Sequence, residues 1–385
     1  LEYYLTEQQK LVKSLARRIA EERILPVRAE LDQKEEFPWA IVKDMADSDL
    51  FRIFIPEQYE GLGEGSFALC IAVEELSRAC CGVALIYAAD ALGSLPILLY
   101  GSDEQKQKYL PDIAAGKKLT GFGLTESGAG SDAAAIKTTA TRDGDDYIIN
   151  GSKMWITNSP KADFICLLAN TSDDKPHKNK SLIVVPMNSP GISFSPHLNK
   201  LGMRSSETAQ IFFDDVRVPQ RYRIGAEGTG FMMQMLQFQE ERMWGAANVI
   251  KSLENCVDKT IEYCRERKTF GQSLLDNQVI HFRLAELQTE IEALRALTYQ
   301  ACELHIEGKD VTKLASMAKL KAGRLGREVT DSCLQYWGGM GYMWDNPLSR
   351  AFRDVRLVSI GGGADEIMLG IICKMMGTLP GKQRD

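Results

Sequence analysis

In the first third of the chain, apolar residues recur every three or four positions, the spacing of one face of a helix. One such run follows Thr6, and others cover residues 39–46 and 68–76. Prolines separate the runs, as expected of a residue that interrupts helix interiors. The pattern therefore predicts a helical domain over residues 1–120.

The period changes between residues 121 and 229. Short runs rich in β-branched and aromatic residues are separated there by Gly, Asn, Asp and Pro, as strands are separated by turns. These runs lie at residues 147–150, 164–168, 182–186 and 210–213. We therefore predict a β-domain over residues 121–229.

Helical periodicity returns after residue 230, in stretches long enough to form a bundle. The longest cover residues 279–306 and 311–337. We predict a C-terminal four-helix bundle over residues 230–385. The fold class is then α+β, with an N-terminal α-helical domain, a middle β-domain and this bundle.

The composition is that of a globular protein with two or three domains: 385 residues, 44% hydrophobic and 25% charged. A formal net charge of -6 argues against general nucleic-acid binding, which needs a basic surface. Nine cysteines without a Cys-x-x-Cys pair favour a reducing compartment over a disulfide framework or a zinc site. The four histidines lie outside the chemical segments described below, so we assign no histidine catalyst and no metal site.

The longest apolar stretch, residues 83–100, is interrupted by Asp90, Gly93 and Pro96, and the start of the chain has no basic-then-apolar signal pattern. We therefore expect no membrane insertion and a cytoplasmic, bacterial protein. A protein of the mitochondrial matrix whose transit peptide has been removed would have the same features.

Two segments of the β-domain carry candidate chemistry. Gly121–Asp132 combines closely spaced glycines with hydroxyl side chains, so backbone amides can approach an anion or the edge of a heteroaromatic ring. Lys153–Asn158 places Trp155 and Thr157 two apart on a strand, where both can face one side. Taken singly, these segments are also explained by a glycine-rich turn and by a tryptophan packed in the core.

Two further segments end predicted helices. Arg267–Gly271 supplies a cation, an aromatic ring and a glycine cap, and Gln335–Tyr342 supplies a glycine-rich turn. Each alone is consistent with a plain helix terminus. Together and in this order, the four segments resemble the acyl-CoA dehydrogenase family nearly from end to end. The resemblance implies FAD as the cofactor, an acyl-CoA thioester as the substrate, electron-transferring flavoprotein as the acceptor, and a homotetramer.

The resemblance also implies roles for individual residues. Thr125 and Thr157 would bond the flavin edge, Trp155 would form a wall of its site, and residues of the bundle would meet the FAD of a neighbouring subunit. The backbone N–H of Gly362 would polarise the thioester carbonyl. The set implied for the cofactor is Phe122, Leu124, Thr125, Gly130, Ser131, Trp155, Thr157, Arg267, Phe270, Gln278, Gln335, Gly338, Gly339, Ala364 and Glu366. The set implied for the substrate is Ser131, Phe238, Arg242, Gly362 and Gly363.

The base that most family members carry is absent. It belongs to a motif like Tyr-Glu-Gly-Thr after an Arg-Asp-x-Arg helix, and that helix is intact here as Phe352–Arg356. The motif itself reads Ile-Gly-Gly-Gly-Ala-Asp-Glu, with Gly362 where the glutamate would be. Glu241 matches the position from which a minority of relatives, including isovaleryl-CoA and long-chain enzymes, supply their base. A solvated helix charge, or an ion-pair partner of Arg242, is the alternative interpretation.

Asp90 is the second candidate base. It lies in an apolar run where family helices line the acyl pocket, and burial would raise the pKa of its carboxyl. An exposed turn or a helix cap is the alternative. A base deep in the pocket would remove a proton from C3 of cyclohex-1-ene-1-carboxyl-CoA while hydride leaves C6, which gives a cyclic conjugated diene. The altered base pattern resembles enzymes that act on this thioester, which is our first substrate hypothesis.

Other functions stay open at this point. With Glu241 as the base, the chain would instead carry out α,β-dehydrogenation of cyclohexanecarboxyl-CoA or of a branched or short-chain acyl-CoA. A flavin oxidase on the same scaffold and a non-catalytic flavin-binding protein are alternatives from other classes. The single short bundle disfavours the longer oxidases, and the intact flavin segments disfavour a scaffold protein.

Overall fold

The computed structural model describes residues 5–380, so the outer ends of the predicted first and third domains, residues 1–4 and 381–385, lie outside it. The N-terminal part is helical, as predicted. Its helices are α1 (Glu7–Ile19), α2 (Arg28–Lys34), α3 (Trp39–Asp47), α4 (Gly65–Ser77), α5 (Cys81–Tyr100) and α6 (Asp103–Ala114). Two of them begin at capping boxes: the Thr6 hydroxyl accepts a hydrogen bond from the backbone N–H of Gln9, and the Ser102 hydroxyl from that of Gln105.

Helix α5 lies in the core of the N-terminal domain. Asp90, Gly93 and Pro96, which interrupt its apolar sequence, all lie within one continuous helix. Because Pro96 has no N–H to donate to the Leu92 carbonyl, the side-chain amide of Gln237 donates to that carbonyl instead, at 2.8 Å. Among the described residues, α5 is the one helix long and apolar enough to span a membrane, and 78% of its apolar window is buried inside the protein.

The middle domain is built on an eight-stranded sheet. Its strands are β1 (Thr120–Gly123), β2 (Thr139–Asp143), β3 (Asp146–Thr157), β4 (Phe164–Asn170), β5 (Lys180–Pro186), β6 (Ile192–Phe194), β7 (Thr208–Pro219) and β8 (Arg223–Ile224). The order is β6-β7-β3-β2-β4-β5-β8, and β1 pairs with β4 in parallel. The four predicted β-rich runs lie in β3, β4, β5 and β7.

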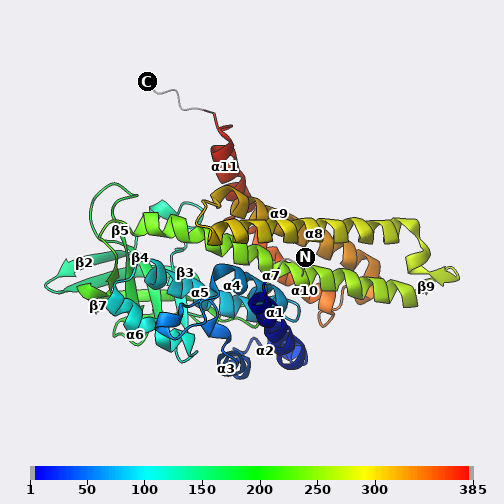
Figure 1. Cartoon of the computed structure of the whole chain (residues 1–385), viewed down its shortest axis with the longest axis horizontal. Helices are drawn as coiled ribbons and strands as arrows, with labels where there is room; N and C mark the ends of the chain where they lie inside the picture. The colour runs from blue at the N-terminus through cyan, green and yellow to red at the C-terminus, as the bar shows by residue number, and fades with distance from the viewer. Residues whose placement is uncertain (1–4, 381–385) are drawn as a thin grey trace.

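The C-terminal bundle consists of α7 (Gly230–Glu266), α8 (Gln278–Ile306) and α9 (Thr312–Trp337), with α10 (Pro347–Val355) and α11 (Asp365–Met376) packed on α9. The two long predicted helices correspond to α8 and α9. Figure 1 shows the sheet at one end of the molecule and the bundle reaching to the other.

The prediction of a glycine-capped helix end at Arg267–Gly271 is wrong. Helix α7 ends at Glu266, and the segment enters a hairpin of β9 (Lys268–Thr269) and β10 (Gln272–Ser273) at the tip of the bundle (Figure 1). The two turn residues, Phe270 and Gly271, have φ of +50° and +83°. A two-residue hairpin turn with positive φ at both positions follows the twist of its strands, which is why this sequence forms a hairpin.

Candidate active site

A buried ion pair fastens the glycine-rich loop after β1 to strand β3. The Glu126 carboxylate and the Lys153 ammonium lie 2.9 Å apart, and the ammonium also donates to the Leu124 carbonyl at 2.9 Å. The backbone N–H of Met154 donates to the Thr125 carbonyl at 2.7 Å. The loop that carries Thr125 is therefore held against the strand that carries the predicted flavin wall.

Sequence reasoning did not identify Glu126 or Lys153. The Glu126 carboxylate also accepts hydrogen bonds from the backbone N–H groups of Lys137 and Thr138, at 2.7 and 2.9 Å. Burial lowers the pKa of Lys153 to about 8, and the charge of Glu126 opposes that shift. The sequence did contain a signal for Glu126, which is a charged residue inside a motif of small, hydroxyl and apolar residues.

Trp155 presents its ring outward. The residue is 57% exposed, and its φ of +59° is a left-handed conformation that is costly for a bulky side chain. A β-bulge lies between Lys153 and Ile156, and Ile156 is buried in the core. This excludes core packing of Trp155. The exposed indole and the half-buried Thr157 fit a flat ring with a polar edge, such as the isoalloxazine of FAD.

The second group of predicted cofactor residues lies at the far end of the bundle, around the hairpin. This group is Arg267, Phe270, Gln278, Gln335, Gly338 and Gly339. The Tyr263 and Trp337 rings stack there at 4.3 Å and hold the end of α7 against that of α9. Helix α7 has 37 residues and so runs about 55 Å from the sheet to this end. Within one chain, the structure does not bring the two groups of cofactor residues together.

Glu241 reaches the position from which the usual family base would project. A Cβ built on Gly362 would stand 3.3 Å from Glu241 Oε1 and 3.8 Å from Lys319 Cε. The φ of Gly362 is +64°, in the region that favours glycine. The structure therefore brings a carboxylate of α7 to the loop between α10 and α11, where the family resemblance expects one.

The surroundings of Glu241 suit a general base. Its carboxylate accepts no hydrogen bond from any residue that the structure describes. Burial raises the pKa of the carboxyl, while the cations Arg242 and Lys319 oppose that rise. The guanidinium of Arg242 lies 5.5 Å from the centre of the Phe238 ring. A partly buried carboxylate with a raised pKa and free oxygen atoms can take a proton from carbon.

Helices α5 and α7 run antiparallel beside this carboxylate. The hydrogen bond from the Gln237 side chain, near the start of α7, reaches the Leu92 carbonyl in the second half of α5. The Cys81 thiol, at the start of α5, donates to the Asn248 carbonyl further along α7, at 3.4 Å. This register sets Glu241 opposite an alanine-rich part of α5. One turn beyond Glu241, a Cβ added to Gly245 would meet no atom within 4 Å. Small residues on both helices thus leave room for an acyl group.

Asp90 lies in the middle of α5, which excludes the helix cap, and it is fully buried, which excludes the exposed turn. Its Oδ1 accepts a hydrogen bond from the backbone N–H of Thr120 at 2.7 Å, and its Oδ2 has no partner among the described residues. Burial raises the pKa of this carboxyl to about 8. Gly93, one turn further, also packs against Thr120. Asp90 therefore faces β1 rather than α7, and the structure does not bring the two candidate bases together.

The remaining predicted residues lie on β1, on the loops and at the helix starts around these positions. Those that are half-buried are Phe122, Leu124, Thr125, Phe238, Gly363 and Ala364. Those that are exposed are Gly130, Ser131, Gly362 and Glu366. None of them is fully buried.

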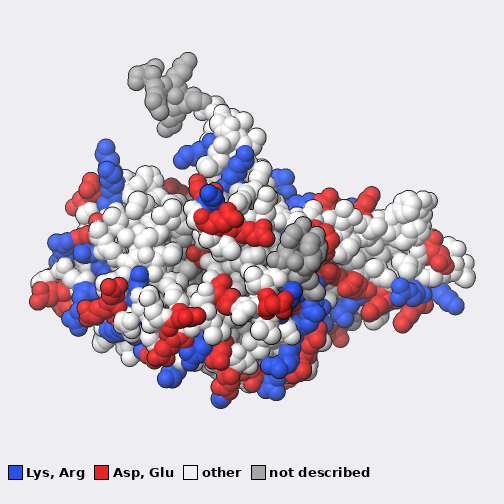
Figure 2. Space-filling view, in the orientation of Figure 1, with Lys and Arg blue, Asp and Glu red and all other residues white. Residues whose placement is uncertain are grey.

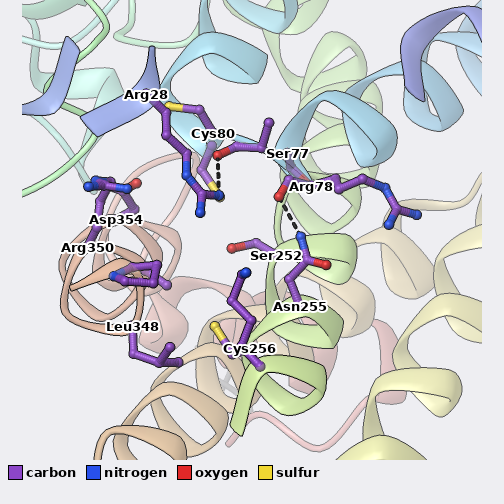
Figure 3. Close-up of a pocket in the computed structure, with 15 residues that line it drawn as sticks. Arg28, Ser77, Arg78, Cys80, Ser252, Asn255, Cys256, Leu348, Arg350 and Asp354 are labelled. Atoms are coloured by element: carbon purple, nitrogen blue, oxygen red, sulfur yellow. Dashed lines mark hydrogen bonds between the residues drawn. The ribbon is translucent and has the colours of Figure 1, made fainter. Parts of the chain in front are cut away.

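A separate hollow lies between the α4–α5 junction, the middle of α7 and α10 (Figure 3). Arg28 points into it, and Cys256 and Asp354 are among the residues that line it. It contains none of the predicted cofactor, substrate or catalytic residues. Across residues 5–380, no three His, Cys, Asp or Glu side chains are arranged to hold a metal ion.

Three family models match successive parts of the chain. They are described as the N-terminal, middle and C-terminal domains of acyl-CoA dehydrogenase, and they match residues 6–117, 121–216 and 228–377. Together they cover most of the sequence.

Known proteins are similar over nearly the whole length. A cyclohexane-1-carbonyl-CoA dehydrogenase of Geobacter metallireducens is 37% identical over 370 residues, which are 96% of this chain and 97% of that protein. The solved butyryl-CoA dehydrogenase of Megasphaera elsdenii has a TM-score of 0.94 at 32% identity, covering 97% of this chain and 98% of that one. A chain in a structural study of the electron transferring flavoprotein of Acidaminococcus fermentans has a TM-score of 0.95 at 34% identity, covering 100% of both chains.

Proposed function

The chain belongs to the acyl-CoA dehydrogenase family, and we propose that it dehydrogenates a saturated acyl-CoA thioester between the α- and β-carbons, with Glu241 as the base. As a member of this family it is an oxidoreductase that acts on CH–CH bonds, with FAD as its cofactor and an acyl-CoA as its substrate. The observation that carries the proposal is the position of Glu241 Oε1, 3.3 Å from where a Cβ on Gly362 would stand.

In this reaction Glu241 removes a proton from the α-carbon, and the electron pair of that C–H bond becomes the α,β double bond as hydride leaves the β-carbon. FAD, when bound, accepts the hydride. The Gly362 N–H would polarise the thioester carbonyl and so acidify the α-proton. The raised pKa of Glu241 makes its carboxylate a stronger base than a solvated one. Proton transfer is most effective when the pKa of the base lies near the working pH, so this shift favours catalysis.

We propose an alicyclic or branched acyl group, with cyclohexanecarboxyl-CoA as the first thioester to test. The similar protein of Geobacter metallireducens is named for a thioester of this kind. The open space beside Gly245, one turn from Glu241, supports the same choice, because a ring at the α-carbon needs more width than a straight chain.

A second candidate function keeps Asp90 as the base and cyclohex-1-ene-1-carboxyl-CoA as the substrate, with loss of the C3 proton and the C6 hydride. The observation that favours it is the buried Oδ2 of Asp90, which has no hydrogen-bond partner within residues 5–380 and belongs to a carboxyl with a pKa of about 8. The hydrogen bond to Thr120 and the orientation toward β1 count against it.

The two functions are separated by one experiment. The FAD-loaded enzyme, with Glu241→Gln and Asp90→Asn variants, is mixed anaerobically in turn with cyclohexanecarboxyl-CoA, isovaleryl-CoA and cyclohex-1-ene-1-carboxyl-CoA while flavin bleaching is recorded. We expect a saturated thioester to bleach the wild type and Asp90→Asn but not Glu241→Gln. Bleaching by the cyclohexene thioester alone, lost in Asp90→Asn and kept in Glu241→Gln, would establish the second function instead.

We also propose a homotetramer in which the hairpin end of one chain completes the FAD site of a neighbour. The distance between the two groups of cofactor residues supports this, and so do the apolar side chains exposed at that end: Phe270, Val279 and Phe282. Figure 2 shows largely uncharged surface on the upper side of this end. Sedimentation of the FAD-loaded enzyme tests the assembly, and a monomer that keeps FAD would contradict it.

For the electron acceptor, we propose an electron-transferring flavoprotein. The similarity to a chain studied with such a flavoprotein supports this choice. Comparing reoxidation of the reduced enzyme by a purified electron-transferring flavoprotein and by air tests it. Fast reoxidation by air alone would place the protein among flavin oxidases.

A further inference from the structure

Lys319 is an almost completely buried lysine. It lies in the first half of α9 and is only 2% exposed. A buried ammonium group is costly unless it finds acceptors, and Lys319 finds them on a loop of glycines. Its Nζ donates to the Val358 carbonyl and, at 2.5 Å, to the Gly363 carbonyl.

These two carbonyls bracket the loop that faces the proposed base. The segment that they delimit ends in three consecutive glycines, 361–363, of which the last carries the second carbonyl, and the last two have φ of +64° and +97°. Glycines have no side chains to hold a loop, and they lose more conformational entropy than other residues when they are fixed. The two hydrogen bonds from Lys319 therefore supply an anchorage that the loop residues cannot supply themselves.

The same lysine lies close to Glu241 without binding it. A Cβ on Gly362 would be 3.8 Å from Lys319 Cε and 3.3 Å from Glu241 Oε1, so both side chains flank one point. The two hydrogen bonds of Lys319 go to carbonyl groups and not to the Glu241 carboxylate. A cation at this offset favours the ionised carboxylate without occupying the lone pair that must receive the proton.

We propose that Lys319 is the positioning residue of this active site, which fixes the glycine loop at residues 361–363 and keeps Glu241 ionised. This rests on the proposed function only for the part that concerns Glu241. The other charged groups near Lys319 are Asp365, whose carboxylate pairs with Arg327 at 2.9 Å, and Arg242 beside Glu241. The charge of Asp365 supports the Lys319 ammonium more than that of Glu241 does, but the hydrogen bonds of Lys319 go to the glycine loop, and its chain lies beside Glu241.

Two substitutions separate the two roles. Lys319→Met removes the charge and both hydrogen bonds, whereas Lys319→Gln removes the charge and keeps an amide donor for one carbonyl. The control is Lys313→Met, one to two turns earlier on the same helix and half-buried. Should Lys319→Met fail to fold, Lys319→Gln carries the test.

The first readout is amide hydrogen exchange of residues 360–364 in the FAD-loaded enzyme, by mass spectrometry. We expect exchange to be faster by about tenfold or more in Lys319→Met, faster by less in Lys319→Gln, and unchanged in Lys313→Met. Wild-type exchange of this loop in both Lys319 variants would overturn the proposal, whatever base the enzyme uses.

The second readout is the pH dependence of kcat/KM for flavin bleaching. We expect the acidic limb of this pH profile to shift to higher pH, by on the order of 1 pH unit, in both Lys319 variants. If Glu241→Gln is inactive and this limb does not move, Lys319 does not act on the base and the proposal is wrong. If Glu241→Gln keeps full activity, the proposed function is wrong, and the exchange result still decides whether Lys319 holds the loop.

Discussion

Glu241 Oε1 lies 3.3 Å from the point at which a Cβ on Gly362 would stand, so positions 241 and 362 share one space beside the glycine loop. This space takes one carboxylate, either from position 241 or from position 362. Two carboxylates at that distance would repel each other, and one of them would be held protonated. Glutamate at position 241 is therefore compatible with glycine, and not with a second glutamate, at position 362.

Glu241→Gln should remove the base while keeping the shape of the side chain. We expect the rate of flavin bleaching by a saturated acyl-CoA to fall by about 10²- to 10⁴-fold, the usual contribution of a general base. Stopped-flow absorbance under anaerobic conditions measures it. FAD content and melting temperature should stay at wild-type values, and a rate within a factor of two of wild type would show that another group is the base.

Moving the carboxylate to the other side of the shared space gives a second prediction. Gly362→Glu alone should lose activity, because the new side chain meets Glu241 and the backbone there has a φ of +64°. The double variant Glu241→Gly, Gly362→Glu should recover part of the activity that each single variant loses. Steady-state assays of all three variants test this, and a double variant no more active than Glu241→Gly would count against a shared space.

Asp90→Asn should change how stability depends on pH. The folded carboxyl has a pKa of about 8 against an ordinary value of 3.8, so between these values the folded chain holds a proton that the unfolded chain releases. Unfolding then becomes easier as pH rises, by about 1.4 kcal/mol per pH unit from this group, and the slope ends near pH 8.

Asparagine keeps the acceptor for the Thr120 N–H but does not titrate. We therefore expect Asp90→Asn to be more stable than wild type at pH 7 and to lack this part of the slope between pH 5 and 7. Urea unfolding at saturating FAD measures both. Parallel stability curves for the two proteins would show that the carboxyl is ionised in the folded state.

Phe270→Asn should remove the aromatic ring at the tip of the hairpin without disturbing the hairpin itself. Asparagine accepts the positive φ of this turn position more readily than phenylalanine, so the hairpin should form at least as well. Loss of the ring should weaken FAD binding by about tenfold, or about 1.4 kcal/mol. Equilibrium dialysis of FAD measures it, with Trp39→Ala as the control, because Trp39 is an exposed aromatic residue of α3, away from this end. Equal affinities of all three proteins would place FAD elsewhere.

Local patterns in the sequence were enough to locate most elements. The runs rich in β-branched and aromatic residues lie in strands of the middle domain, because such side chains suit a sheet. The long periodic stretches lie in helices of the bundle, because their period marks the buried face. The hairpin after Arg267 was missed, since its signal is a turn with positive φ at a phenylalanine, which residue type alone does not predict.

The sequence by itself determined the order of the three domains, the segments that resemble a flavin site, and the absence of glutamate at position 362. Only the tertiary structure decided which carboxylate lies beside that position. Glu241 meets the glycine loop and Asp90 turns toward Thr120, because helices α5 and α7 pack in a register fixed by contacts between residues far apart in the chain. Burial and electrostatic coupling depend on that packing, so the raised pKa of both carboxyl groups and the hydrogen bonds from Lys319 to the glycine loop followed from the fold.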